Sequence, residues 1–151
     1  SHDSSIVYHE SFHVLIDQLS RLPFEKEGGS INEAFADFFT CLMTNSPRLA
    51  ESSYLKAPFK RNLENIVRLN EKNGGLYHDS LIVSGLLWAT KEKIGVEKTK
   101  KLAFEILLQL NPHSDFNSFN SKSLEVAKDF LNSQDLLAFK TILKNRGFKD
   151  E

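Results

Sequence analysis

This chain of 151 residues has few cysteines and lacks long apolar runs and glycine-rich loops. Its single cysteine, Cys41, excludes an internal disulfide, and the apolar residues around it predict a buried thiol rather than a nucleophile. No apolar run reaches the roughly 18 residues of a membrane span, and no glycine-rich phosphate loop occurs. The net charge is −1, with acids and bases interspersed. This balance gives no electrostatic case for nucleic acid as a partner.

What the chain does have is apolar bulk at helical spacing. Hydrophobic residues make up 40 % of the sequence and include twelve phenylalanines, enough for one core and one domain over residues 1–151. Strand alternation is not convincing, and residues 45–72 are expected to be irregular, with helical turns after Pro47 and at 62–70. Residues 1–3 are expected to be a tag remnant or a disordered start. We therefore expect an all-α fold, a bundle of helices over about residues 4–20, 30–44, 77–94, 96–110, 121–132 and 134–146.

The most informative motif is His9-Glu10-Ser11-Phe12-His13, which reads H-E-x-x-H within an apolar stretch. On a helix, His9 and His13 lie one turn apart on the same face, where two imidazoles can bind one Zn²⁺. Glu10 lies one step round the helix, where a general base for a water molecule should stand. The alternative is a solvated helix face without a metal, which the apolar flanks disfavour.

A second motif follows at residues 28–37, which read G-G-S-I-N-E-A-F-A-D. Ser30 and Glu33 have the spacing of a capping box, which predicts a helix that begins at Ser30. Glu33 and Asp37 are four residues apart and share a face of that helix. Glu33 could supply a third zinc ligand, and Asp37 could hydrogen-bond the outer nitrogen of a zinc-binding histidine. Alternatively, Glu33 only caps its own helix and Asp37 is a surface acid.

Together the two motifs resemble those of the thermolysin-like zinc metallopeptidases, the gluzincins. In that family the third ligand is a Glu in an N-E-A-x-x-D helix, and residues 32–37 read N-E-A-F-A-D, with Glu33 twenty positions after His13. The resemblance implies the all-α, C-terminal lobe of a catalytic domain, with one Zn²⁺ held by His9, His13 and Glu33. It also implies hydrolysis of peptide bonds by water, with Glu10 as the general base.

The resemblance extends to residues 73–78, which read N-G-G-L-Y-H before an apolar helix. The family carries a similar G-G-x-x-H-type element, whose His donates a hydrogen bond to the oxyanion of the reaction. This similarity implies the same catalytic role for His78. Asp79 is the candidate for orienting His78, although Asn73 is the residue nearest to the place where the family usually has its acid.

Arg61 resembles the arginine that the family places near the zinc to bind substrate, and its guanidinium is expected to pair with the peptide carbonyl or the oxyanion. Arg48 and Arg68 are its rivals for this role. The chain departs from the family at Phe24, nine residues before the expected Glu ligand. The family commonly has a tyrosine there as a second oxyanion donor, which phenylalanine cannot replace.

Two further departures concern calcium and length. The positions of the family's calcium-binding acids hold Ser5 and Thr44, so we expect no double-calcium site. Only eight residues precede His9, whereas the family's catalytic unit has an N-terminal β-rich lobe there. We therefore expect a monomeric helical lobe of a longer metallopeptidase. It should fold and bind zinc alone but cleave peptides poorly without its missing partner lobe.

Two other functions remain open besides a zinc metalloendopeptidase acting on peptide or protein substrates. One is a zinc-binding but inactive interaction module or pseudoenzyme. The other is an aminopeptidase-type gluzincin, which usually has its Glu ligand one residue closer to the second His and uses a Tyr donor. The residues specify neither the substrate sequence nor the compartment, and only the family resemblance suggests a secreted or cell-envelope protein.

Overall fold

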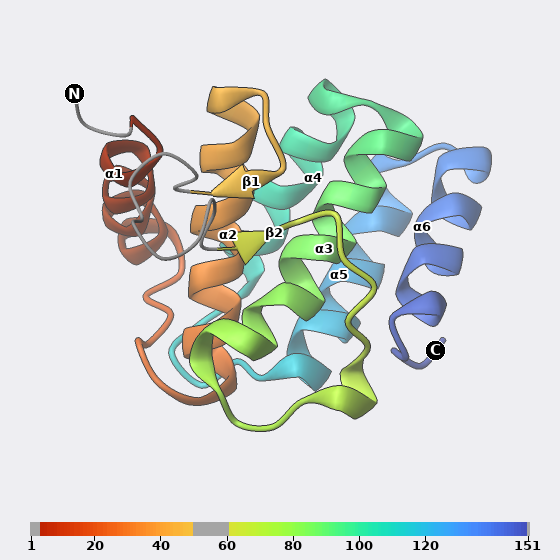
Figure 1. The fold of residues 1–151 in the computed structure, drawn as a ribbon. Coiled ribbons are helices and arrows are strands. Elements are labelled where there is room, and N and C mark those ends of the chain that lie inside the picture. The colour runs from red at the N-terminus through yellow and green to blue at the C-terminus, as the bar shows by residue number, and fades with distance from the viewer. Residues whose placement is uncertain (1–3, 50–60, 151) are drawn as a thin grey trace.

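Six α-helices form a bundle in the computed structural model, which describes residues 4–49 and 61–150 (Figure 1). The helices are α1 (Ser4–Leu19), α2 (Lys26–Thr44), α3 (Leu76–Ile94), α4 (Val96–Gln109), α5 (Phe116–Phe130) and α6 (Ser133–Asn145). The expected all-α class is confirmed. Two short antiparallel strands, β1 (Arg48–Leu49) and β2 (Arg61–Asn62), and a 3₁₀ turn, η1 (Leu69–Glu71), complete the described elements. The start predicted for residues 1–3 lies outside the described residues.

Helix α2 forms the centre of the core, with its most extensive contacts to α1 and α3. Residues 28–41 of this helix are all buried, as expected for an element covered on every side. The largest fully buried side chains are phenylalanines from α2, α5 and α6: Phe35, Phe38, Phe116, Phe119 and Phe139. Cys41 lies in the same core as a free thiol, and burial raises its pKa. The prediction of a buried thiol is confirmed.

Helix α2 begins at Lys26, so the prediction of a helix start and a capping box at Ser30 is wrong. Ser30 is buried within the helix, and its Oγ donates a hydrogen bond of 2.9 Å to the carbonyl of Leu76, which ties α2 to the start of α3. The first turn packs directly on the preceding loop, because a Cβ on Gly28 would lie 2.8 Å from the Pro23 ring. The glycines that read as a loop thus serve close packing inside the helix.

The other boundaries agree in part with the sequence patterns. Helices α3, α4 and α6 have the expected bounds to within one residue at each end. Helix α5 begins at Phe116 rather than at residue 121, because the Asp115 side chain caps it by accepting from Ser118 N at 2.8 Å. The helical turn expected after Pro47 is wrong, since β1 begins there, and the turn expected at 62–70 is reduced to η1.

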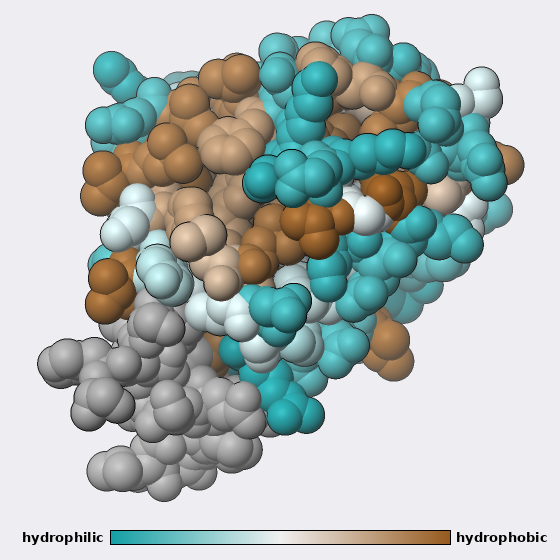
Figure 2. All heavy atoms as spheres, turned by 90° about the horizontal axis from the view of Figure 1, so that it is seen from above, coloured by the Kyte–Doolittle hydropathy of each residue, from teal (hydrophilic) through white to brown (hydrophobic). Residues whose placement is uncertain are grey.

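Helix α1 has two contrasting sides. Val7 is 57 % exposed and Val14 is 61 % exposed, and their spacing places them on one face. His9 and His13 fall on the opposite face, toward α2. Figure 2 shows the molecule from above, and hydrophobic side chains form an apolar area on this face. None of the described helices combines the length and the apolar character needed to cross a bilayer.

Candidate metal centre

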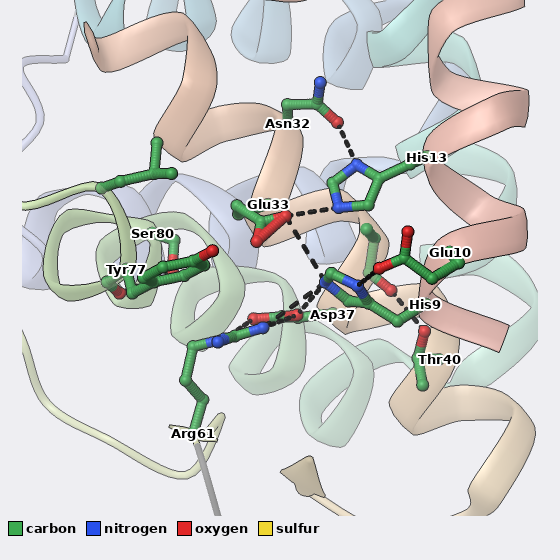
Figure 3. Close-up of polar contacts among 12 residues, drawn as sticks. His9, Glu10, His13, Asn32, Glu33, Asp37, Thr40, Arg61, Tyr77 and Ser80 are labelled. Atoms are coloured by element: carbon green, nitrogen blue, oxygen red, sulfur yellow. Dashed lines mark hydrogen bonds and ion pairs between the residues drawn. The ribbon is translucent and has the colours of Figure 1, made fainter. Parts of the chain in front are cut away.

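Helices α1 and α2 bring His9, His13 and Glu33 together (Figure 3). One potential ligand atom from each of these residues lies within 4.8 Å of the other two. Glu33 Oε2 contacts His13 Nε2 and lies 3.5 Å from His9 Nε2. The two imidazole rings are 4.5 Å apart and nearly perpendicular. Two imidazoles one helical turn apart and a carboxylate from a second helix thus converge on a single point.

The chemistry of this cluster suits a divalent cation. Glu33 Oε2 is buried and has no hydrogen-bond partner among the described residues, although two imidazole nitrogens lie near it. A buried carboxylate oxygen without a directional bond is costly unless a cation compensates it. Two nitrogen ligands and one oxygen ligand are a set that zinc prefers, with a fourth position left open. The orphaned oxygen and the donor set therefore fit zinc.

The protonation of His13 agrees with this fit. Burial by itself lowers the pKa of His13, but its contact with the Glu33 carboxylate outweighs burial and raises the pKa above the ordinary value. In the metal-free arrangement His13 therefore holds a proton more strongly than an ordinary histidine does. A metal that binds both side chains would displace this proton, so binding should release protons.

Asn32 fixes the orientation of the His13 ring. Its Nδ2 donates to the carbonyls of Leu22 and Pro23, each at 3.1 Å, which leaves Oδ1 facing His13 Nδ1 at 2.8 Å. Because Oδ1 can only accept, Nδ1 must carry the hydrogen, and in the neutral ring the lone pair is then on Nε2, which faces Glu33. No role was predicted for Asn32, although it stands directly before Glu33 in the N-E-A-F-A-D motif.

Asp37 lies behind His9 and is fully buried. Its Oδ1 is 2.8 Å from His9 Nε2, and Arg61 donates to both of its oxygens, from Nη2 to Oδ1 at 2.8 Å and from Nε to Oδ2. Burial raises the pKa of Asp37, but the hydrogen bonds from Arg61 and His9 outweigh it and lower the pKa. Asp37 is therefore held as a carboxylate. It contacts the His9 nitrogen that also faces Glu33, rather than the outer one.

Glu10 and Arg61 differ sharply in exposure. The Glu10 side chain is 75 % exposed, and its Oε1 lies 3.6 Å from His9 Nδ1, so this carboxylate is accessible to water beside the cluster. Arg61 is buried, with Nη2 3.4 Å from His9 Nε2. Its Nη1 has no hydrogen-bond partner in the part of the chain that the structure describes. Arg61 thus brings an unused donor to the cluster.

His78 and Asp79 form a pair of their own at the start of α3. His78 Nδ1 lies 2.8 Å from Asp79 Oδ1, and Asp79 also accepts from the backbone N–H groups of Asn73 and Gly74. Between the described residues, no hydrogen bond or ion pair joins His78 to His9, His13 or Glu33. The neighbouring residue, Tyr77, points toward the cluster instead (Figure 3). No role was predicted for Tyr77, although it lies in the segment 73–78 that was singled out for His78.

Known proteins with related sequences are bacterial proteases by name. The chain is 27 % identical over 148 residues to bacillolysin of Bacillus amyloliquefaciens, a match that covers 86 % of this chain and 28 % of that protein. It is 24 % identical to neutral protease NprE of Bacillus pumilus, with 86 % and 49 % covered. A zinc metalloproteinase of Listeria monocytogenes is 27 % identical, with 83 % and 29 % covered. No family model matches the chain.

The homologues of this chain are thermolysin-like zinc metalloproteases. The resemblance that the two motifs indicated is thereby confirmed. The matches extend over most of the chain, so they are not confined to a short motif. The chain spans between 28 % and 49 % of the length of these relatives.

Proposed function

We propose that this chain is the helical, zinc-binding part of a metalloendopeptidase, with His9, His13 and Glu33 as the metal ligands. The observation that carries the proposal is the convergence of the three side chains around the orphaned, buried Glu33 Oε2. A divalent cation at this point would contact the oxygen and both imidazole nitrogens at once. The relationship to zinc metalloproteases supports the same reading.

Zinc, when bound, supplies Lewis-acid activation of a water molecule and of the peptide carbonyl. Glu10, exposed beside His9, accepts a proton from the attacking water and passes it to the leaving amine. The buried Arg61 donates to the carbonyl oxygen of the substrate from Nη1, which has no partner among the described residues. Asp37 holds the Arg61 guanidinium by two hydrogen bonds, so this donor is preorganised rather than mobile.

The proposal is tested with a peptide that is blocked at its N-terminus. We expect the zinc-loaded chain to cleave such a peptide at an internal bond, slowly, to lose this activity with a zinc chelator, and to regain it when zinc is restored. Cleavage restricted to peptides with a free N-terminus would favour the aminopeptidase alternative. Zinc binding without any hydrolysis would favour the interaction module.

Replacing Asn32 by Ala is expected to lower the zinc affinity about 10–100-fold, the usual effect of losing a group that orients a ligand. The physical reason is that His13 Nδ1 loses its acceptor, so the ring no longer presents Nε2 in one orientation. Competition with a zinc chelator measures the change. The matched control is Asn120→Ala, which removes another buried amide, bonded to the Lys149 carbonyl far along the chain. Equal zinc affinity in both variants would contradict the role of Asn32.

A further inference from the structure

Tyr77 stands at the first turn of α3 and is linked to the metal cluster through Arg61. The Arg61 guanidinium carbon lies 4.8 Å from the centre of the Tyr77 ring, a cation–π contact. The same guanidinium is hydrogen-bonded to Asp37 and lies 3.4 Å from His9 Nε2. Figure 3 shows the Tyr77 ring with its hydroxyl directed toward Glu33. The ring is therefore held in place on one side of the cluster.

The position of Tyr77 allows its hydroxyl to meet a ligand. The residue is 46 % exposed, although Arg61 beneath it is buried. The phenol can thus reach a peptide that approaches the cluster from solvent, while its ring remains anchored on the guanidinium. Among the described residues, the Phe24 ring lies 5.7 Å from the His13 ring, and this side chain has no donor.

The helix geometry separates Tyr77 from His78. Adjacent residues on a helix point about 100° apart, so the two side chains cannot both face the cluster. His78 turns to Asp79, which is itself fixed by the two N–H groups of the preceding turn. The Nδ1 of His78 is therefore engaged by Asp79, and Tyr77 occupies the direction toward the site (Figure 3).

We propose that the Tyr77 hydroxyl, and not His78, donates a hydrogen bond to the carbonyl oxygen of the scissile peptide as negative charge develops on it. This inference rests on the proposed function of the site. Tyr77 is then a catalytic residue that acts beside Nη1 of Arg61, so that two donors from different elements meet the same oxygen. The hydrogen bond strengthens as charge grows, so its effect falls on turnover rather than on binding of the uncharged substrate.

The test compares Tyr77→Phe, which removes only the hydroxyl, with Tyr8→Phe and His78→Ala. Tyr8→Phe is the matched control, because it removes a phenol from the half-buried position before His9. Each zinc-loaded variant is characterised by its zinc content, its kcat and KM on a blocked peptide, and its Kd for a phosphonamidate peptide, whose tetrahedral oxyanion imitates the developing charge. Thermal unfolding shows that each variant is folded.

For Tyr77→Phe we expect unchanged zinc content, a nearly unchanged KM, and a kcat reduced by roughly 10²–10³-fold. The Kd for the phosphonamidate should rise at least about tenfold, a readout that does not depend on turnover. His78→Ala and Tyr8→Phe should change neither Kd nor kcat by more than about twofold. A phosphonamidate Kd that is unchanged in Tyr77→Phe, or that rises in His78→Ala instead, would overturn the inference while leaving the metal site standing. A wild-type chain that binds neither zinc nor the phosphonamidate would overturn the proposed function itself.

Discussion

Replacing Glu10 by Gln is expected to leave the bound zinc in place and to reduce peptide hydrolysis by roughly 10²–10⁴-fold, the usual contribution of general-base catalysis. Gln has nearly the shape of Glu but cannot accept a proton from water. Glu10 is exposed and is not one of the three converging ligands, so its substitution removes no metal-binding atom from the cluster. The measurement is kcat on a blocked peptide together with the zinc content of the same sample.

Asp17→Asn is the matched control for this substitution. Asp17 is an exposed acid on the same helix, two turns away from Glu10, and its change removes the same charge. It should leave both turnover and zinc content unchanged. Normal turnover in Glu10→Gln would remove the general-base assignment, and loss of zinc in this variant would show that Glu10 contributes to the metal site.

Replacing Glu33 by Ala is expected to weaken zinc binding by more than about 100-fold, beyond the roughly 10–100-fold typical of a residue that only supports a ligand. The variant removes the one carboxylate oxygen that faces both imidazoles. Zinc stabilises a folded chain by RT ln(1 + [Zn²⁺]/Kd), so the rise in Tm that zinc causes in the wild type should disappear in the variant. Calorimetry with and without zinc measures both effects.

The choice of control follows from the contacts of the two acids that precede Glu33. Glu25 is exposed and makes no side-chain cap at the start of α2, so Glu25→Ala should keep the zinc affinity and the stability. Glu27 binds Lys72 at 2.7 Å and accepts from Phe116 N at 2.9 Å, so Glu27→Ala should lower the Tm without a specific effect on zinc. Equal loss of zinc in all three variants would mean that Glu33 is not a ligand.

Most helix boundaries could be predicted, because the residues that end these helices are adjacent to them in the sequence. Gly95, with φ +100°, separates α3 from α4, and Gly147, with φ +92°, follows α6, as the sequence indicated. The start of α2 could not be predicted, because it depends on the packing of Gly28 against Pro23. Helix propensities are assigned to each residue separately and do not include such a contact. The early start of α5 had a local signal, the Asp115 cap, that was overlooked.

The candidate site also has parts that the sequence predicts and parts that it does not. The spacing of His9 and His13 predicts a shared helix face, and the structure brings both to Glu33. Spacing cannot decide between Tyr77 and His78. The two residues are adjacent on one helix, so a shift of one residue changes which side chain faces the cluster. The role of Asn32 was equally hidden, since it depends on two carbonyls of the loop between α1 and α2. Orientation, rather than residue type, is what the sequence left undetermined.

The zinc content and the zinc coordination of the purified chain test the central claim most directly. After removal of loosely bound metal, elemental analysis should give about one zinc per chain, and X-ray absorption at the zinc edge should show two imidazole nitrogens and carboxylate oxygen as protein ligands. The paired substitution His9→Ala and His13→Ala should abolish this zinc. A chain that retains no zinc, or a zinc content that is the same after both histidines and Glu33 are replaced, would contradict the assignment of the metal centre.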